Sequence, residues 1–106
     1  MSSPPLAISP DHWEIVRAIM ELHLQQFEVW AFGSRARGPA KPYSDLDLAV
    51  LTDNPLSFRQ YAHLCDAFAE SNLPFKVDVV DWATTSEAFR ATIAAERVVV
   101  KEKPVA

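Results

Sequence analysis

Both glycines of the chain lie in one stretch of twenty residues, AFGSRARGPAKPYSDLDLAV, at positions 31–50. The segment before Gly33, FEVWAF (27–32), is rich in aromatic and β-branched residues and is typical of a strand. The segment DLDLAVL (45–51) alternates and then becomes apolar, which is typical of a strand with one end open and the other buried. Because glycine permits a sharp turn and a close approach of the backbone, the stretch predicts two strands joined by a tight corner.

The rest of the chain predicts helices around a small sheet. Apolar residues recur at helical spacing in three segments, and β-branched residues form two further short runs. Together these elements predict an α/β (α+β) domain, with a small mixed β-sheet of three to four strands flanked by helices, in an order that the sequence leaves open. The predicted elements are a helix from Ser9-Pro10 to about Gln26, a short turn or loop at 34–40, a helix opened by Asn54-Pro55 with Tyr61, Leu64, Cys65 and Phe68 on its buried stripe, a strand at 75–80, a helix capped by Thr84 and Glu87 that ends near Ala95, and a short strand at 97–101.

Length and composition restrict the class of protein. The 106 residues fit one small domain, and we expect residues 1–8 to be a flexible N-terminal arm and residues 9–106 to be that single domain. A net charge of −4 argues against nucleic acid as a partner, and no apolar run is long enough to span a membrane. With Cys65 as the single cysteine, no internal disulfide can form, which fits a cytoplasmic protein.

Three aspartates predict a metal site. Side chains alternate along a strand, so Asp45 and Asp47 project from one face, where their repulsion becomes favourable around a hard divalent cation. Asp78 lies between valines in the strand 75–80, and the three acids converge if the two strands are neighbours. Three converging carboxylates suit two metal ions in phosphoryl or nucleotidyl transfer. The alternative is a solvated strand end with Asp78 on a wet edge; Asp81 faces the other side and is left out of the site.

The corner between the two strands predicts a phosphate site. Ser34 begins a turn whose free N–H groups and hydroxyl can bind an anion, and Gly33 allows the backbone to approach it. Arg35 and Arg37 supply positive charge suited to phosphate. No Gly-Lys-Ser/Thr follows, so this is not a P-loop. The alternative is an ordinary strand-to-helix corner with a solvated basic face.

In combination, these residues resemble the DNA polymerase β-like nucleotidyltransferase superfamily. Its signature is Gly-Ser, a spacer of about ten residues, Asp-x-Asp and a distant third acid. Here the signature is met by Gly33-Ser34, ten intervening residues, Asp45-Leu46-Asp47 and Asp78. The run FGSRARG…SDLDLAV is specifically similar to the minimal nucleotidyltransferases, or MNT proteins, which often form the antitoxin half of HEPN–MNT toxin–antitoxin pairs. The resemblance covers about residues 27–81.

The resemblance implies a polymerase β-like nucleotidyltransferase fold and a role for each matched residue. It implies that Asp45 and Asp47 bind two Mg²⁺ ions, and that Asp78 binds one of them and helps to activate the attacking hydroxyl. The Gly33-Ser34 corner would bind the β- and γ-phosphates of ATP, together with Arg35 and Arg37. The implied reaction moves AMP from ATP to a hydroxyl, which in characterised MNT antitoxins is a tyrosine of the HEPN ribonuclease toxin.

The identity of the acceptor is left open by the residues themselves. The chain has no stretch to spare for an acceptor-binding domain, so we expect another protein, or a second copy in a homo- or hetero-oligomer, to hold the acceptor. Two other functions stay open: an antitoxin that neutralises its partner by binding alone, and a transferase acting on a small molecule such as an aminoglycoside. The complete set of acids argues against pure binding.

Overall fold

The structure is a computed structural model that describes residues 4–105 of the chain. Its longest helix has 14 residues, and no helix within the described range has the length and apolar character needed to cross a membrane. The helices and strands alternate along the chain as the predicted α/β class requires. In chain order they are α1 (Pro10–His23), β1 (Glu28–Phe32), α2 (Ser34–Arg37), β2 (Leu46–Leu51), α3 (Phe58–Ala69), β3 (Val77–Asp81), the 3₁₀ helix η1 (Trp82–Thr84), α4 (Glu87–Glu96) and β4 (Val98–Lys101).

The four strands form one mixed sheet in the order β3-β2-β1-β4. Strand β1 runs antiparallel to both β2 and β4, whereas β2 and β3 are parallel. The parallel pair needs a long crossover, which α3 provides. This arrangement confirms the predicted small mixed sheet and supplies the strand order that the sequence left open.

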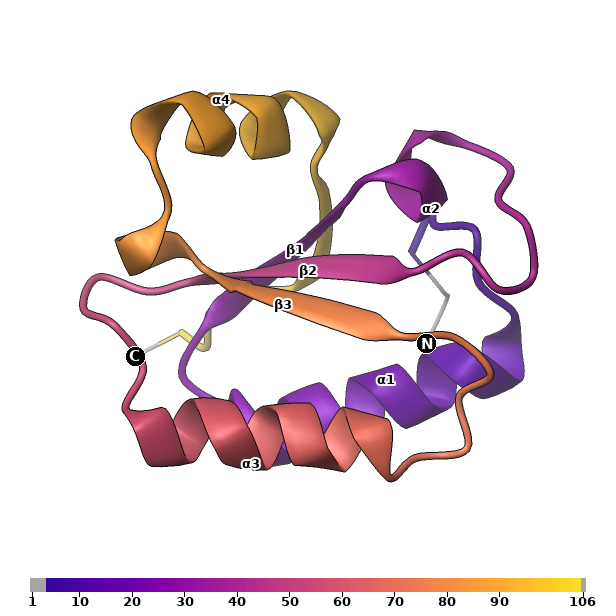
Figure 1. Cartoon of the computed structure of the whole chain (residues 1–106), viewed down its shortest axis with the longest axis horizontal. Coiled ribbons are helices and arrows are strands. Elements are labelled where there is room, and N and C mark those ends of the chain that lie inside the picture. The colour runs from indigo at the N-terminus through magenta and orange to yellow at the C-terminus, as the bar shows by residue number, and fades with distance from the viewer. Residues whose placement is uncertain (1–3, 106) are drawn as a thin grey trace.

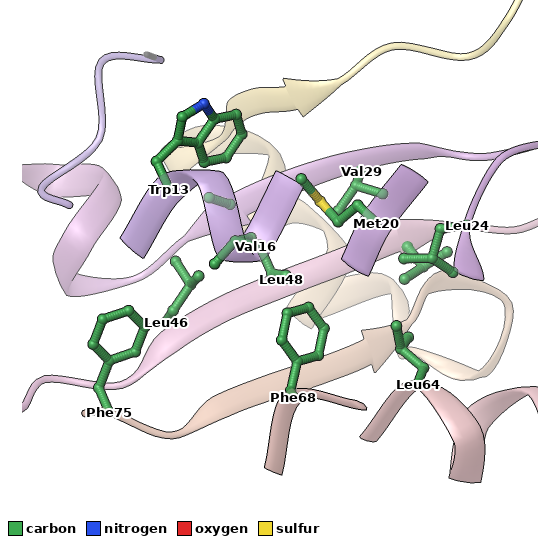
Figure 2. Close-up of a cluster of buried hydrophobic side chains, with 12 residues drawn as sticks. Trp13, Val16, Met20, Leu24, Val29, Leu46, Leu48, Leu64, Phe68 and Phe75 are labelled. Atoms are coloured by element: carbon green, nitrogen blue, oxygen red, sulfur yellow. The ribbon is translucent and has the colours of Figure 1, made fainter. Parts of the chain in front are cut away.

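Helices cover the two faces of the sheet unequally (Figure 1). Helices α1 and α3 lie together below the sheet, whereas α4 lies above it, with the short helix α2 at the upper right. The main core fills the space between the sheet, α1 and α3, and ten of its side chains are labelled in Figure 2. The alternation of β2 sends Leu46, Leu48 and Val50 into this core, so Asp47 projects from the face on the α4 side.

Two predicted helix starts are wrong by two to four residues. Helix α3 begins at Phe58 and not at Asn54-Pro55, because Ser57 and Gln60 form a capping box: the Gln60 N–H donates to the Ser57 hydroxyl at 3.0 Å, and the Ser57 N–H donates to the Gln60 side chain at 3.1 Å. Helix α4 is capped by Ser86, whose hydroxyl accepts from the Phe89 N–H at 3.2 Å, and not by Thr84. The predicted Ser9 cap of α1 is confirmed, although α1 ends at His23 rather than near Gln26.

The prediction that Tyr61 lies on the buried stripe of α3 is wrong. Its side chain is 39% exposed, and its hydroxyl donates to the Val79 carbonyl at 3.1 Å, at the outer edge of β3. Leu64 and Phe68 of the same stripe are buried as predicted. A phenol on a helical stripe can lie at the boundary of the core because its polar end finds a partner at the surface.

The part of the predicted flexible arm that the structure describes, residues 4–8, is attached to the domain. Leu6 and Ile8 pack against the main core. The Ala7 N–H donates to the Arg35 carbonyl at 2.8 Å, and the Ala7 carbonyl accepts from the Arg35 side chain at 2.6 Å. These contacts attach residues 4–8 to the domain, while residues 1–3 of the predicted arm lie outside the described range.

Candidate active site

The structure brings the predicted acids to one face of the sheet. Asp47 in β2 and Asp78 in β3 are register partners in the parallel pair, and Asp45 immediately precedes β2. Register partners on neighbouring strands project from the same face, here the one on the α4 side. Asp81 accepts a hydrogen bond from the Leu56 N–H at 2.8 Å and caps η1, so it lies outside this group as the sequence indicated.

The charges of these acids interact. Partial burial raises the pKa of Asp47 above its ordinary value, and the nearby carboxylates of Asp78 and Asp45 raise it further. A partly buried carboxylate beside two others is unfavourable unless a cation lies among them. The electrostatics of the face therefore fit a positively charged ligand.

Asp78 is held differently from the other two acids. Its carboxylate pairs with the Lys76 ammonium at 3.2 Å and borders a groove between α3 and the edge strand β3. Asp45 and Asp47 border a separate hollow of about 470 Å³. Within residues 4–105 no three His, Cys, Asp or Glu side chains are already arranged as a metal site. The oxygen donors are nevertheless of the type that Mg²⁺ takes, commonly with one or two carboxylates and phosphate oxygens.

Gly33 forms a corner in direct contact with Asp47. Its backbone has φ 77° and ψ −158°, a region that residues with a side chain rarely adopt. A Cβ atom built at Gly33 would collide with the Asp47 carboxylate. Ser34, the next residue, begins α2 and borders the hollow that contains Asp45 and Asp47. The Gly-Ser corner and the Asp-x-Asp pair thus belong to one site.

Arg37 and Glu96 close another side of the same hollow. The Arg37 guanidinium donates to Glu96 Oε2 at 2.9 Å, and the Gly33 N–H donates to Glu96 Oε1 at 3.0 Å. The hydrogen bond from Gly33, reinforced by Arg37, lowers the pKa of Glu96 below its ordinary value. Arg37 keeps 58% of its side chain exposed, so it remains available to a ligand in the hollow.

Arg35, for which the sequence predicts a contact with phosphate, does not border the hollow that contains Asp45 and Asp47. It is only 5% exposed, and its guanidinium donates to the backbone carbonyls of Ser44 at 2.8 Å, Ala7 at 2.6 Å and Pro42 at 3.0 Å. The guanidinium also lies 4.0 Å from the centre of the Phe75 ring. Its donors are therefore used in holding residues 7 and 42–44 together, next to the start of β2.

Glu96 was not among the candidates found from the sequence. It follows Asp78 by eighteen residues and shares no spacing with the motif, so periodicity could not point to it. One local sign exists: it is the last residue of α4, where the helix dipole disfavours a negative charge.

A family model described as polymerase beta, nucleotidyltransferase, matches residues 16–104. The match spans most of the chain and includes every acid and corner residue discussed above. The chain belongs to this nucleotidyltransferase family. The mixed sheet with its flanking helices is thus that of a nucleotidyltransferase domain, which confirms the predicted fold.

A curated relative supports the narrower resemblance to MNT proteins. The chain is 49% identical over 98 residues, covering 92% of this chain and 86% of the relative, to a Haemophilus influenzae protein named probable protein adenylyltransferase MntA. That degree of identity over nearly the whole length places this nucleotidyltransferase among the relatives of MntA.

Solved structures show the same fold at lower identity. A toxin–antitoxin complex with AMP-PNP contains a chain with TM-score 0.68 and 22% identity, over 83% of this chain and 71% of that one. A complex of a tri-AMPylated Shewanella oneidensis HEPN toxin with MNT antitoxin contains a chain with TM-score 0.63 and 20% identity, over 83% and 67%. These similarities support the fold of the nucleotidyltransferase domain.

Proposed function

We propose that this nucleotidyltransferase moves AMP from ATP to a tyrosine hydroxyl of a HEPN-type toxin and thereby acts as its antitoxin. The observation that carries the proposal is the contact of Gly33 with Asp47, together with the register pairing of Asp47 and Asp78. These contacts unite a corner suited to phosphate with acids suited to a metal ion. The relative named protein adenylyltransferase MntA and the complexes with an AMPylated HEPN toxin and with AMP-PNP support the choice of reaction and partner.

The residues of the site have different roles in the proposed reaction. Asp45, Asp47 and Asp78 would hold two Mg²⁺ ions, which supply charge neutralisation for the triphosphate. Ser34 and Arg37 bind the β- and γ-phosphates, because both border the hollow that contains Asp45 and Asp47. The acceptor oxygen forms a bond to the α-phosphorus, the bond to the bridging oxygen of pyrophosphate breaks, and Asp78 receives the hydroxyl proton.

The open side of the site supports a protein acceptor. Asp78 lies in β3, an edge strand in which every residue is partly exposed. A hydroxyl on another molecule can therefore reach Asp78 without crossing the domain. In Figure 1, β3 lies at the front of the sheet, and α4 does not extend along its first half.

The test is transfer of label from ATP. The protein is incubated with labelled ATP, Mg²⁺ and a HEPN-type toxin protein, and the products are analysed by mass spectrometry. Addition of AMP to a tyrosine of the HEPN protein is expected, and Asp78→Asn should abolish it while leaving the complex intact. Omission of Mg²⁺ in the presence of a chelator should abolish it as well.

Two other outcomes would replace the proposal. Neutralisation of the toxin that survives Asp45→Asn combined with Asp47→Asn would indicate an antitoxin that acts by binding. Label on a small-molecule hydroxyl, with no partner protein present, would indicate a small-molecule transferase.

A further inference from the structure

Glu96, the last residue of α4, contacts two groups of the site. One carboxylate oxygen of Glu96 accepts from the Gly33 N–H at 3.0 Å, and the other accepts from the Arg37 guanidinium at 2.9 Å. Gly33 therefore lies between two carboxylates, since Asp47 occupies the space where a side chain of residue 33 would stand. The Glu96 side chain is 23% exposed, so these contacts are partly shielded from water.

Helix stability does not explain a carboxylate at this position. Negative charge at a helix C-terminus opposes the helix dipole. The last turn of α4 itself contains no basic residue, and the Arg97 guanidinium that follows it donates to the Ala94 carbonyl at 2.7 Å rather than to Glu96. Glu96 also lies in the same hollow as Asp45 and Asp47, where a further negative charge is repelled. The contacts of Glu96 with Gly33 and Arg37 must offset the unfavourable helix dipole and the repulsion from the aspartates. This indicates that these contacts, and not helix stability, are the role of a carboxylate at residue 96.

Each contact restricts a group that the proposed reaction uses. The bond to the Gly33 N–H ties the corner to α4 and so sets the direction in which Ser34 faces the hollow. The ion pair uses one nitrogen of Arg37, and no other hydrogen bond of this guanidinium is found within residues 4–105. An arginine held at one end, with donors to spare, loses less conformational freedom when it binds phosphate.

We propose that Glu96 is a positioning residue for nucleotidyl transfer, which holds the Gly33-Ser34 corner and Arg37 in the orientation that receives the phosphates of ATP. This inference rests on the proposed function. Since Glu96 acts through the binding of the phosphates, its loss weakens the ground state and the transition state alike, which raises KM and leaves kcat nearly unchanged.

The experiment compares Glu96→Ala, Glu96→Gln and a matched control, Glu87→Gln, in steady-state AMP transfer to the HEPN protein. Glu87 is an exposed acid in the first turn of the same helix, so its substitution changes the net charge without touching the hollow. For Glu96→Ala we expect a KM for ATP about tenfold higher and a kcat within about twofold of the original, in line with the loss of charged hydrogen bonds. Glu96→Gln retains an oxygen for the Gly33 N–H and should raise KM only about threefold.

A double-mutant cycle with Arg37→Ala identifies the route of the effect. If Glu96 acts partly through Arg37, the increase in KM caused by Glu96→Ala should shrink in the Arg37→Ala background. The thermal midpoint of every variant is measured alongside, so that rates are compared well below unfolding.

Three results would overturn the inference. Tighter ATP binding by Glu96→Ala would show that the carboxylate competes with phosphate. A lower Tm with unchanged KM and kcat would show a purely structural role. An effect of Glu87→Gln as large as that of Glu96→Gln would show a general effect of charge. An original protein that neither binds ATP nor transfers AMP would instead refute the proposed function, and the inference with it.

Discussion

The contact between Gly33 and Asp47 yields a prediction with a built-in control. Gly33→Ala places a Cβ in a strained backbone conformation and against the Asp47 carboxylate, whereas a Cβ at Gly38, at φ 155°, would meet no atom within 4 Å. Gly38→Ala thus carries backbone strain alone, which costs about 1–3 kcal/mol. Gly33→Ala carries similar strain and a steric conflict with the end of the Asp47 side chain, which can turn away, so we expect it to cost about 1 kcal/mol more than Gly38→Ala.

The conflict at Gly33 should also reduce activity. Relief of the clash moves the Asp47 carboxylate, and a displacement of about 1 Å can lower the rate on the order of a hundredfold. Urea unfolding measures the free-energy differences, and AMP transfer to the HEPN protein measures the rates. We expect Gly33→Ala to lose activity on that scale and Gly38→Ala to retain most of it.

A second background isolates the contact itself. In Asp47→Ala, the two atoms nearest to the added Cβ are absent and the remaining neighbour, the residue 47 Cβ, stands at 3.6 Å, an ordinary contact distance. There Gly33→Ala should cost no more than Gly38→Ala. If Gly33→Ala matches Gly38→Ala in stability and rate with Asp47 present, the contact that unites the corner and the acid pair does not exist.

Three further outcomes are expected. Arg35→Ala should lower the free energy of unfolding by about 2–4 kcal/mol, because buried backbone carbonyls lose their donor. The KM for ATP of the folded protein should not change. An increase in KM without loss of stability would instead indicate that Arg35 binds phosphate. The raised pKa of Asp47 means that folding favours its protonated form, so stability is lost as the pH rises through that pKa. With EDTA present, Asp47→Asn should therefore raise Tm at pH 7 by about 1–2 °C, a small shift because Asp47 is partly solvated. This gain in Tm should vanish below pH 3.8, the ordinary pKa of aspartate. Ser57→Ala, which removes the cap of α3, should cost about 1 kcal/mol in urea unfolding with no change in AMP transfer, and Thr84→Ala should cost less, since Thr84 caps no α-helix.

The sequence by itself determined the local directions of the site. Alternation along β2 placed Asp47 on one face and the leucines on the other, because successive side chains of a strand point to opposite sides, and the same pattern predicted Asp45, just before β2, on the face of Asp47. The glycine at 33 marked a corner that other residues rarely form. The family resemblance rested on the same residues, since the spacing of the Gly-Ser and Asp-x-Asp motif is a local property of the chain.

Only the tertiary structure decided which distant groups meet. Pairing β3 with β2 made Asp78 the neighbour of Asp47, and strand order depends on long-range contacts that periodicity does not record. The two arginines of the corner looked equivalent in sequence, yet packing buried Arg35 among backbone carbonyls and left Arg37 at the hollow. Glu96 joined the site because α4 ends beside Gly33. The sequence gives the chemical type of each residue, but its contacts depend on how segments far apart along the chain pack together.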